Sequence, residues 1–140
     1  MGKINLGRVV LGGLLAGLVL NVFDWAVNGL WLANDWNAAM KALGKSEMSG
    51  SLIMWFVVAD FLVGVFLVWL YAAIRPRFGV GPQTAVYAGL AVWALMGFIH
   101  GVAEAPMGLF PMNLYVISTG LALVFVPVAS VVGVWAYKEG

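Results

Sequence analysis

The chain has 140 residues, of which 64% are hydrophobic and 9% are charged, and its formal net charge is +1. Soluble domains carry about 25% charged residues, so this composition excludes an ordinary water-exposed globule and predicts a protein of the lipid bilayer. The chain contains no cysteine and no run of like charge. Thiolate metal sites, disulfides and cysteine nucleophiles are therefore excluded, and nothing in the charge pattern favours binding to nucleic acid.

Four long apolar runs follow one another along the chain, and each is long enough to cross a bilayer as a helix. They predict an all-α, integral membrane, antiparallel (up-down-up-down) four-helix bundle. We place its spans at about residues 6–32, 51–74, 83–104 and 113–137 of a single transmembrane domain that covers residues 1–140. The polar linker after the first run predicts a short interfacial helix around residues 36–43. Pro76 is expected to end the second span and Pro82 to begin the third.

Basic residues are distributed unevenly over the two ends of this predicted bundle. Five lie at the end that holds both termini: Lys3, Arg8, Arg75, Arg77 and Lys138. The other two, Lys41 and Lys45, lie in the first linker. Because cationic loops favour the cytoplasmic side, we expect both termini to be cytoplasmic and the chain to lie in the inner (plasma) membrane of the cell.

Small residues recur at helical spacing in two of the predicted spans. Gly13 and Gly17 form a GxxxG motif in the first span, and the third span carries a stripe of small residues at Ala85, Gly89, Gly97 and Gly101. Such stripes allow helix backbones to approach closely in a membrane. We expect packing within one molecule, with a homo-oligomer seam as the alternative.

Ionisable side chains interrupt the apolar spans at one predicted depth. At 1.5 Å per residue, Asp24, Asp60 and His100 each lie within about 6 to 14 Å of the outer face. His100 and Glu104 are spaced i, i+4, and Asn21, Asp24 and Asn28 share a stripe. Ionised groups in a span face one another, a partner or water. We therefore predict a ligand-binding polar pocket in the outer half of the bundle, and we expect no comparable polar set in the inner half. The pocket comprises Asp24, Asp60, His100 and Glu104, surrounded by Asn21, Asn28, Asn113, Tyr115, Ser118 and Thr119.

The predicted pocket favours a binding or accessory protein, which holds a small ligand or a lipid or belongs to a larger membrane complex. The alternatives are proton or metal-ion handling, and tetrapyrrole binding with His100 as axial ligand and Met96 or Met107 opposite. A membrane enzyme ranks last, because the sequence contains no H-E-x-x-H, G-x-S-x-G or Gly-rich phosphate motif. No particular cofactor is indicated, and each ionisable residue could instead serve only packing.

Three features in chain order carry a resemblance to a known group. They are a Trp- and Asn-rich end of the first span, a Trp-Asn-x-x-Met segment at residues 36–40, and Gly-Leu-Ala-Val-Trp at residues 89–93. In these features the chain resembles small four-span bacterial membrane proteins grouped as a domain of unknown function. The resemblance covers most of the chain and implies the four-span architecture. It implies no activity or ligand and carries over no site residues.

Overall fold

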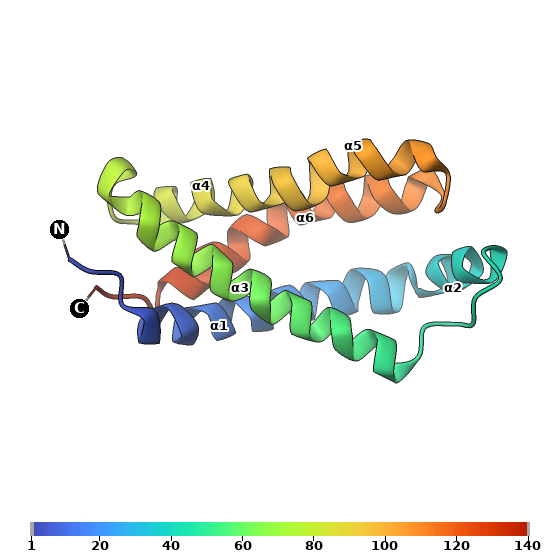
Figure 1. Ribbon diagram of the computed structural model, residues 1–140, viewed down its shortest axis with the longest axis horizontal. Helices are drawn as coiled ribbons and strands as arrows, with labels where there is room; N and C mark the ends of the chain where they lie inside the picture. The colour runs from blue at the N-terminus through green and yellow to red at the C-terminus, as the bar shows by residue number, and fades with distance from the viewer. Residues whose placement is uncertain (1, 140) are drawn as a thin grey trace.

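The computed structural model describes residues 2–139, which form helices joined by turns and loops and contain no strand. Four of the helical segments are long, and Figure 1 shows both termini at one end of the molecule. In chain order the elements are α1 (Leu6–Asp24), the π-helix η1 (Trp25–Trp31), α2 (Ala33–Ala42), α3 (Gly50–Phe78), α4 (Pro82–Trp93), the π-helix η2 (Ala94–Ile99), α5 (His100–Glu104), the 3₁₀ turn η3 (Ala105–Met107) and α6 (Met112–Val134).

The four apolar runs each form a continuous helical segment that is long and apolar enough to cross a membrane. These segments are Leu6–Trp31, Gly50–Phe78, Pro82–Met107 and Met112–Val134. The short helix expected in the first linker is also present, as α2. The prediction of four long apolar helices is therefore confirmed, with shifts of a few residues at their ends.

Local sequence explains most of the helix boundaries. Asn5 and Ser49 accept hydrogen bonds from backbone N–H groups of the first turns of α1 and α3, as N-cap side chains do, and Pro82 occupies the first turn of α4. The expectation that Pro76 ends the second span is wrong, because α3 continues to Phe78. Proline here removes only one N–H near the helix end. The helix instead ends at Gly79, which has φ of 92° and donates to the carbonyl of Arg75 at 2.8 Å.

Glycine contacts bring three helix pairs together. A Cβ atom at Gly64 of α3 would lie 2.5 Å from the backbone nitrogen of Gly17 on α1, and one at Gly89 of α4 would lie 2.5 Å from Cα of Pro127 on α6. A Cβ atom at Gly133 of α6 would lie 2.7 Å from the carbonyl oxygen of Gly12 on α1. These distances leave no room for a side chain, so the glycines are what allows the backbones to pack so closely.

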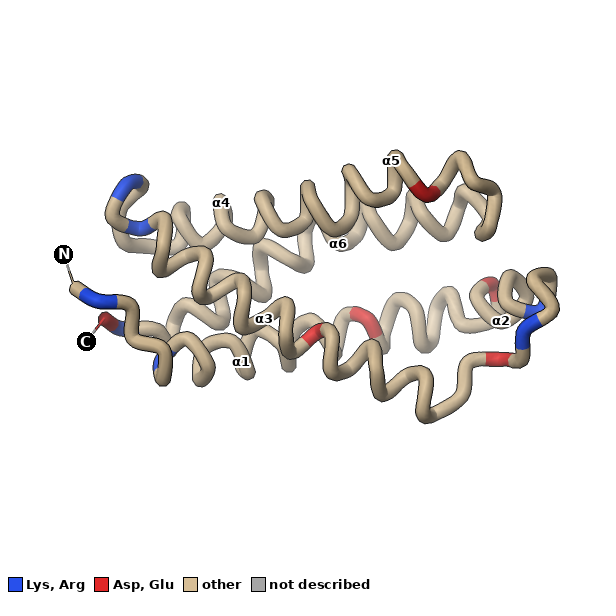
Figure 2. The backbone as a smooth tube through the Cα atoms, viewed as in Figure 1, with Lys and Arg blue, Asp and Glu red and all other residues tan. Residues whose placement is uncertain are grey.

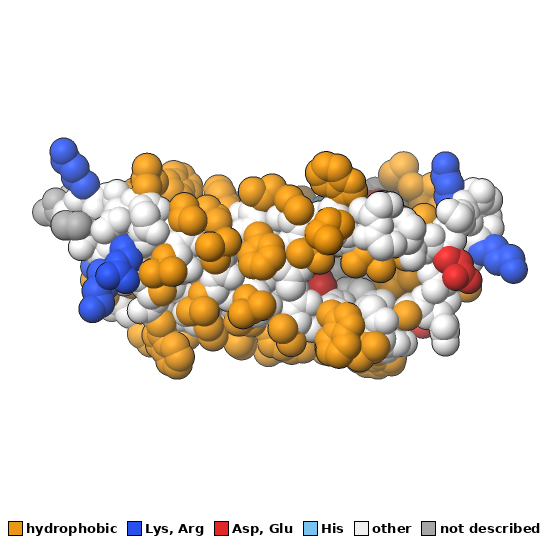
Figure 3. Space-filling model, turned by 90° about the horizontal axis from the view of Figure 1, so that it is seen from below, with side chains coloured by type: hydrophobic (Ala, Val, Ile, Leu, Met, Phe, Trp, Pro, Cys, Tyr) orange, Lys and Arg blue, Asp and Glu red, His pale blue; other side chains and the backbone are white. Residues whose placement is uncertain are grey.

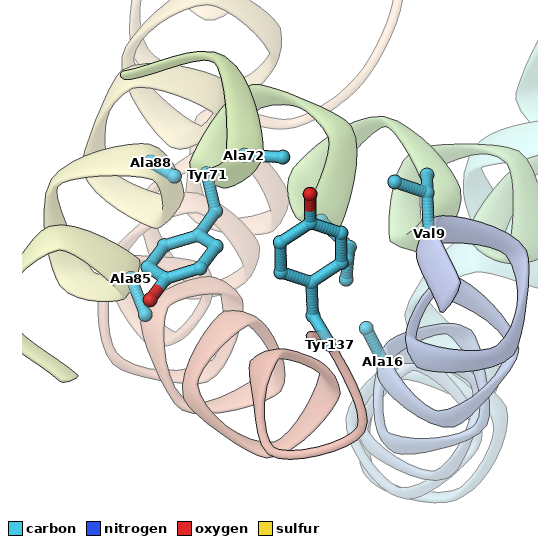
Figure 4. Close-up of a cluster of buried hydrophobic side chains, with 8 residues drawn as sticks. Val9, Ala16, Tyr71, Ala72, Ala85, Ala88 and Tyr137 are labelled. Atoms are coloured by element: carbon cyan, nitrogen blue, oxygen red, sulfur yellow. The ribbon is translucent and has the colours of Figure 1, made fainter. Parts of the chain in front are cut away.

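Glycine packing concentrates the core toward the end that holds the termini. Its main cluster joins α1, α3, α4 and the residues after α6. In Figure 4 the Tyr71 ring points towards Ala85, and Tyr137 stands beside it. The stripe predicted on the third span packs against α6 as far as Gly97, where a Cβ atom would lie 3.5 Å from Cγ2 of Thr119. It does not extend to Gly101, where a Cβ atom would meet nothing within 4 Å.

The opposite half of the molecule is packed more loosely. A smaller cluster, Val27, Leu32, Ala39 and Leu114, joins η1 and α2 to α6. The first three turns of α3 and most of η2 and α5 leave their apolar side chains exposed, including Trp55 and Leu95. This is the half in which the sequence predicts the polar pocket.

Candidate functional site

Two carboxyl groups face each other where α1 and α3 begin to separate. Asp24 is the last residue of α1 and is exposed, whereas Asp60 lies in the middle of α3 and is half-buried. Figure 2 shows the two acidic positions on α1 and α3 close to each other, and the two side chains are near enough to interact electrostatically. The second oxygen of Asp60, Oδ2, is buried and has no hydrogen-bond partner among the described residues. These two residues of the predicted pocket are therefore neighbours in the structure.

Asn28 extends this pair toward α6. Its side-chain nitrogen donates to Oδ1 of Asp24 at 3.5 Å, and its side-chain oxygen accepts from the Trp36 indole at 3.0 Å and the Ser118 hydroxyl at 3.2 Å. Polar groups of α1, η1, α2 and α6 are thus joined in one network. We call Asp24, Asp60, Asn28, Trp36 and Ser118 the carboxylate site.

Three other residues predicted for the pocket have different surroundings. The side-chain nitrogen of Asn21 donates to the carbonyls of Gly17 at 3.0 Å and Val57 at 3.4 Å, so it bridges the backbones of α1 and α3. The backbone carbonyl of Thr119 accepts from the Trp93 indole at 2.8 Å. Asn113 is exposed and lines a cavity at the end of the molecule away from the termini, which we call the outer end.

His100 and Glu104 form a separate cluster on α5. Nε2 of His100 lies 2.7 Å from Oε2 of Glu104, and the His100 side chain is 66% exposed. Tyr115 on α6 is near enough to interact electrostatically with Glu104, but its buried hydroxyl makes no hydrogen bond among the described residues. In Figure 2 the acidic position on α5 lies apart from the two on α1 and α3.

The prediction that Asp24, Asp60, His100 and Glu104 meet in one pocket is therefore wrong. Within residues 2–139 no three His, Asp or Glu side chains approach closely enough to share a metal ion. Equal depth does not set the direction in which a side chain points. The π-helix η2 ends immediately before His100, and its i→i+5 turns change the phase of the residues that follow. A regular α-helix, which the sequence analysis assumed, would not make this change.

Two cavities lie elsewhere, one at each end of the molecule. The outer cavity, of about 430 Å³, lies between α2 and the turn before α6, and Asp35, Phe110 and Asn113 are among its lining residues. The inner cavity, of about 420 Å³, lies between the end of α3, the start of α4 and the residues after α6. Neither is lined by Asp24, Asp60, His100 or Glu104.

Polar and charged residues at and beyond the inner ends of the predicted spans line the inner cavity. Tyr71 and Arg75 of α3 line it together with Tyr137, Lys138 and Glu139. Part of this cavity could have been predicted from the sequence, because Tyr71 and Arg75 are spaced i, i+4 and so share one helix face. The sequence analysis used Arg75 and Lys138 only for their contribution to orientation.

The carboxylate site contains only a few kinds of functional group. It offers two carboxyl groups, one amide, one hydroxyl and one indole N–H, with no nitrogen ligand and no nucleophile beside a base. This set does not match the usual surroundings of a transition-metal ion. Nε2 of His100 is engaged by Glu104, so Nδ1 is the ring nitrogen that remains for an axial role. The arrangement is suited to holding a proton or a positively charged group.

Comparison with known proteins identifies no relative of this chain. No family model, curated protein or solved structure gives a significant match to the chain. The resemblance to small four-span bacterial membrane proteins therefore stays a prediction. Function has to be inferred from the chemistry of the sites.

Proposed function

We propose that the chain is an integral membrane protein whose four long segments cross the bilayer in an up-down-up-down order, with both termini in the cytoplasm. The lengths and hydropathy of the four segments support insertion. The charges support the orientation, because Figure 2 shows most of the Lys and Arg positions at the end that holds the termini.

We further propose that it is a binding protein, which holds a small cationic solute or a proton at the carboxylate site. The observation that carries this proposal is the pairing of Asp24 and Asp60 without a cation. Among residues 2–139 the ion pairs are Arg75 with Glu139 and His100 with Glu104, so neither aspartate has a basic partner.

The energetic cost of this pair indicates the class of ligand. A single ionised carboxylate near the middle of a membrane costs about 2.5–3.5 kcal/mol on insertion scales, and two adjacent negative charges also repel each other. A proton or a positive charge between the two groups removes both penalties. Asn28, which is held by Trp36 and Ser118, supplies an amide beside that position.

A subunit role in a larger membrane complex is the second candidate, because part of the carboxylate site reaches the surface. Asp24 is exposed, and Figure 3 shows an acidic side chain at the surface midway along the molecule, between hydrophobic side chains. A lysine or arginine from a partner span would neutralise the pair as a bound cation does. In that case the isolated chain would not respond to small cations.

The test uses the purified full chain in neutral detergent micelles. We would measure the midpoint of thermal unfolding in ammonium, methylammonium, choline and sodium chlorides at equal ionic strength, together with a pH titration. At least one of these cations, or protonation, is expected to raise the midpoint for the natural chain. The rise is expected to disappear in Asp24→Asn and Asp60→Asn.

Glu104→Gln is the matched control, because it also replaces an acid by an amide in the outer half but leaves the carboxylate site intact. It is expected to keep the response of the natural chain. Equal responses in Asp24→Asn, Asp60→Asn and the natural chain would refute the binding proposal. No response at all, with co-purification of a second membrane protein that Asp60→Asn loses, would favour the subunit role.

A further inference from the structure

The residues that line the inner cavity are suited to binding an anion. Its volume of about 420 Å³ falls within the range of small-molecule pockets. Tyr71 and Tyr137 form an aromatic wall, with ring centroids 6.0 Å apart and planes at 83° (Figure 4). Their hydroxyls accept hydrogen bonds from the backbone N–H groups of Gly81 at 3.1 Å and Asn5 at 3.4 Å, which fixes both rings.

Arg75 is held rigidly against this wall. Its guanidinium carbon lies 5.9 Å from the centre of the Tyr71 ring and 5.6 Å from that of Tyr137, within the range of cation–π contacts. The side chain is only 17% exposed, and Nε lies 3.5 Å from Oε1 of Glu139. Among residues 2–139 no hydrogen bond or ion pair engages its two terminal nitrogens, so the parallel donors that match a phosphate or carboxylate are unused.

The surroundings of Arg75 add positive potential. Lys138 also lines the cavity, and so do Gly81 and Pro82 at the start of α4. The beginning of a helix carries a partial positive charge from its unpaired N–H groups. Among the described residues that line the cavity, Glu139 is the only acidic one, and its closest contact is with Nε of Arg75.

Two exposed apolar side chains form part of the rim of the cavity. Val80 and Trp135 line the cavity while remaining 72% and 79% exposed. Tryptophan is enriched at the level of lipid headgroups, where its ring has apolar and polar neighbours. An anion bound by Arg75 would therefore have apolar surface immediately beside it.

We propose that the inner cavity binds a phosphate group, with the terminal nitrogens of Arg75 as the main donors and Lys138 as a second cation. The apolar rim favours the phosphate of an anionic membrane lipid over a free phosphate ion. This site is separate from the carboxylate site and does not depend on it. Because Glu139 competes for the same guanidinium, its carboxylate weakens the binding of the phosphate.

The test compares two arginines two residues apart. Arg75→Gln removes the proposed donor, whereas Arg77→Gln removes an equal charge from an exposed side chain that does not line the cavity. Full-length protein in neutral detergent would be titrated with phosphatidylglycerol or phosphatidylcholine of the same acyl chains, and bound lipid counted by native mass spectrometry. Inorganic phosphate would be titrated separately by thermal shift.

Phosphatidylglycerol is expected to bind the natural chain and Arg77→Gln alike and to bind Arg75→Gln about tenfold more weakly, as the loss of a bidentate charge-assisted contact predicts. Phosphatidylcholine is expected to bind less tightly and to be less sensitive to Arg75. If inorganic phosphate alone shows the dependence on Arg75, the phosphate chemistry is supported and its source is a soluble ion. Equal effects of the two arginine substitutions would overturn the proposal, because attraction to surface charge would then suffice.

A second pair of variants keeps the test decisive if Arg75→Gln fails to fold. Glu139→Gln removes the competing carboxylate and is expected to tighten binding of phosphatidylglycerol severalfold. Lys138→Gln, which changes an exposed side chain, is expected to weaken it severalfold. Unchanged binding in both variants would overturn the proposal.

Discussion

The close approach of α1 and α3 makes Gly64 the position where one added methyl group should cost most. An alanine there would place Cβ 2.5 Å from the nitrogen and 2.8 Å from Cα of Gly17, and no flexible side chain is available to move aside. Overpacking of this kind costs about 1–3 kcal/mol. Gly120 of α6 is the control, because a Cβ atom there meets nothing within 4 Å.

The comparison cancels the intrinsic preference of helices for alanine over glycine, about 1 kcal/mol at either position. Gly64→Ala is therefore expected to be about 1–3 kcal/mol less stable than Gly120→Ala. The free energy of unfolding would be measured by titrating the folded chain in mixed micelles with sodium dodecyl sulfate and following far-UV circular dichroism. Equal stability of the two variants would refute the backbone contact between α1 and α3.

Three further predictions concern a buried hydroxyl, the exposed histidine and the orientation. Ser130→Ala removes a buried 2.7 Å hydrogen bond to the carbonyl of Ala85 and is expected to destabilise the fold by about 0.6–1.7 kcal/mol in the same titration; an unchanged midpoint would contradict this. His100→Gln is expected to stay within about 1 kcal/mol of the natural chain, because its ion pair is exposed, whereas a larger loss would indicate a structural role. In intact cells, an impermeant maleimide is expected to label Lys45→Cys but not Lys138→Cys, since the chain has no other cysteine; the reverse pattern would invert the proposed topology.

The helices could be predicted from the sequence because their physical causes are local. Run length, the caps at Asn5 and Ser49 and the proline at Pro82 each act within a few residues. The GxxxG motif likewise predicted a close approach at Gly13 and Gly17. The partner of that motif, Gly64 on α3, could not be predicted, because nothing in the first helix specifies which glycine it meets.

Site geometry depends on rotation about the helix axis as well as on depth. Counting residues along the helices predicted that Asp24 and Asp60 lie at a similar depth, since each residue belongs to a regular α-helix. His100 follows a π-helical segment, and the composition of residues 94–99 does not distinguish i→i+4 from i→i+5 bonding. The error in the predicted pocket therefore concerns the placement of α5, whose acidic position lies apart from those on α1 and α3 (Figure 2).

The inner cavity escaped prediction for a different reason. Arg75 lies within α3, while Tyr137 and Glu139 follow α6, so more than sixty residues separate the two sides of the site. Single-sequence patterns report neighbours on one element, whereas this site forms only when two elements meet. Arg75 is also a basic residue near the end of a predicted span, where its charge already supports the proposed membrane orientation. The sequence therefore offers no reason to look for a second role.

The two sites lie in regions that differ in packing density. Glycine contacts hold the backbones together toward the termini, where the inner cavity is built from fixed rings and a fixed guanidinium. Asp24 and Asp60 lie where α1 and α3 begin to separate and η1 replaces α-helix. Local stability falls with the density of buried contacts, so the carboxylate site lies next to the part of the molecule that can rearrange at least cost. A ligand that bridges the two carboxylates would therefore order the outer half while leaving the packed inner half unchanged.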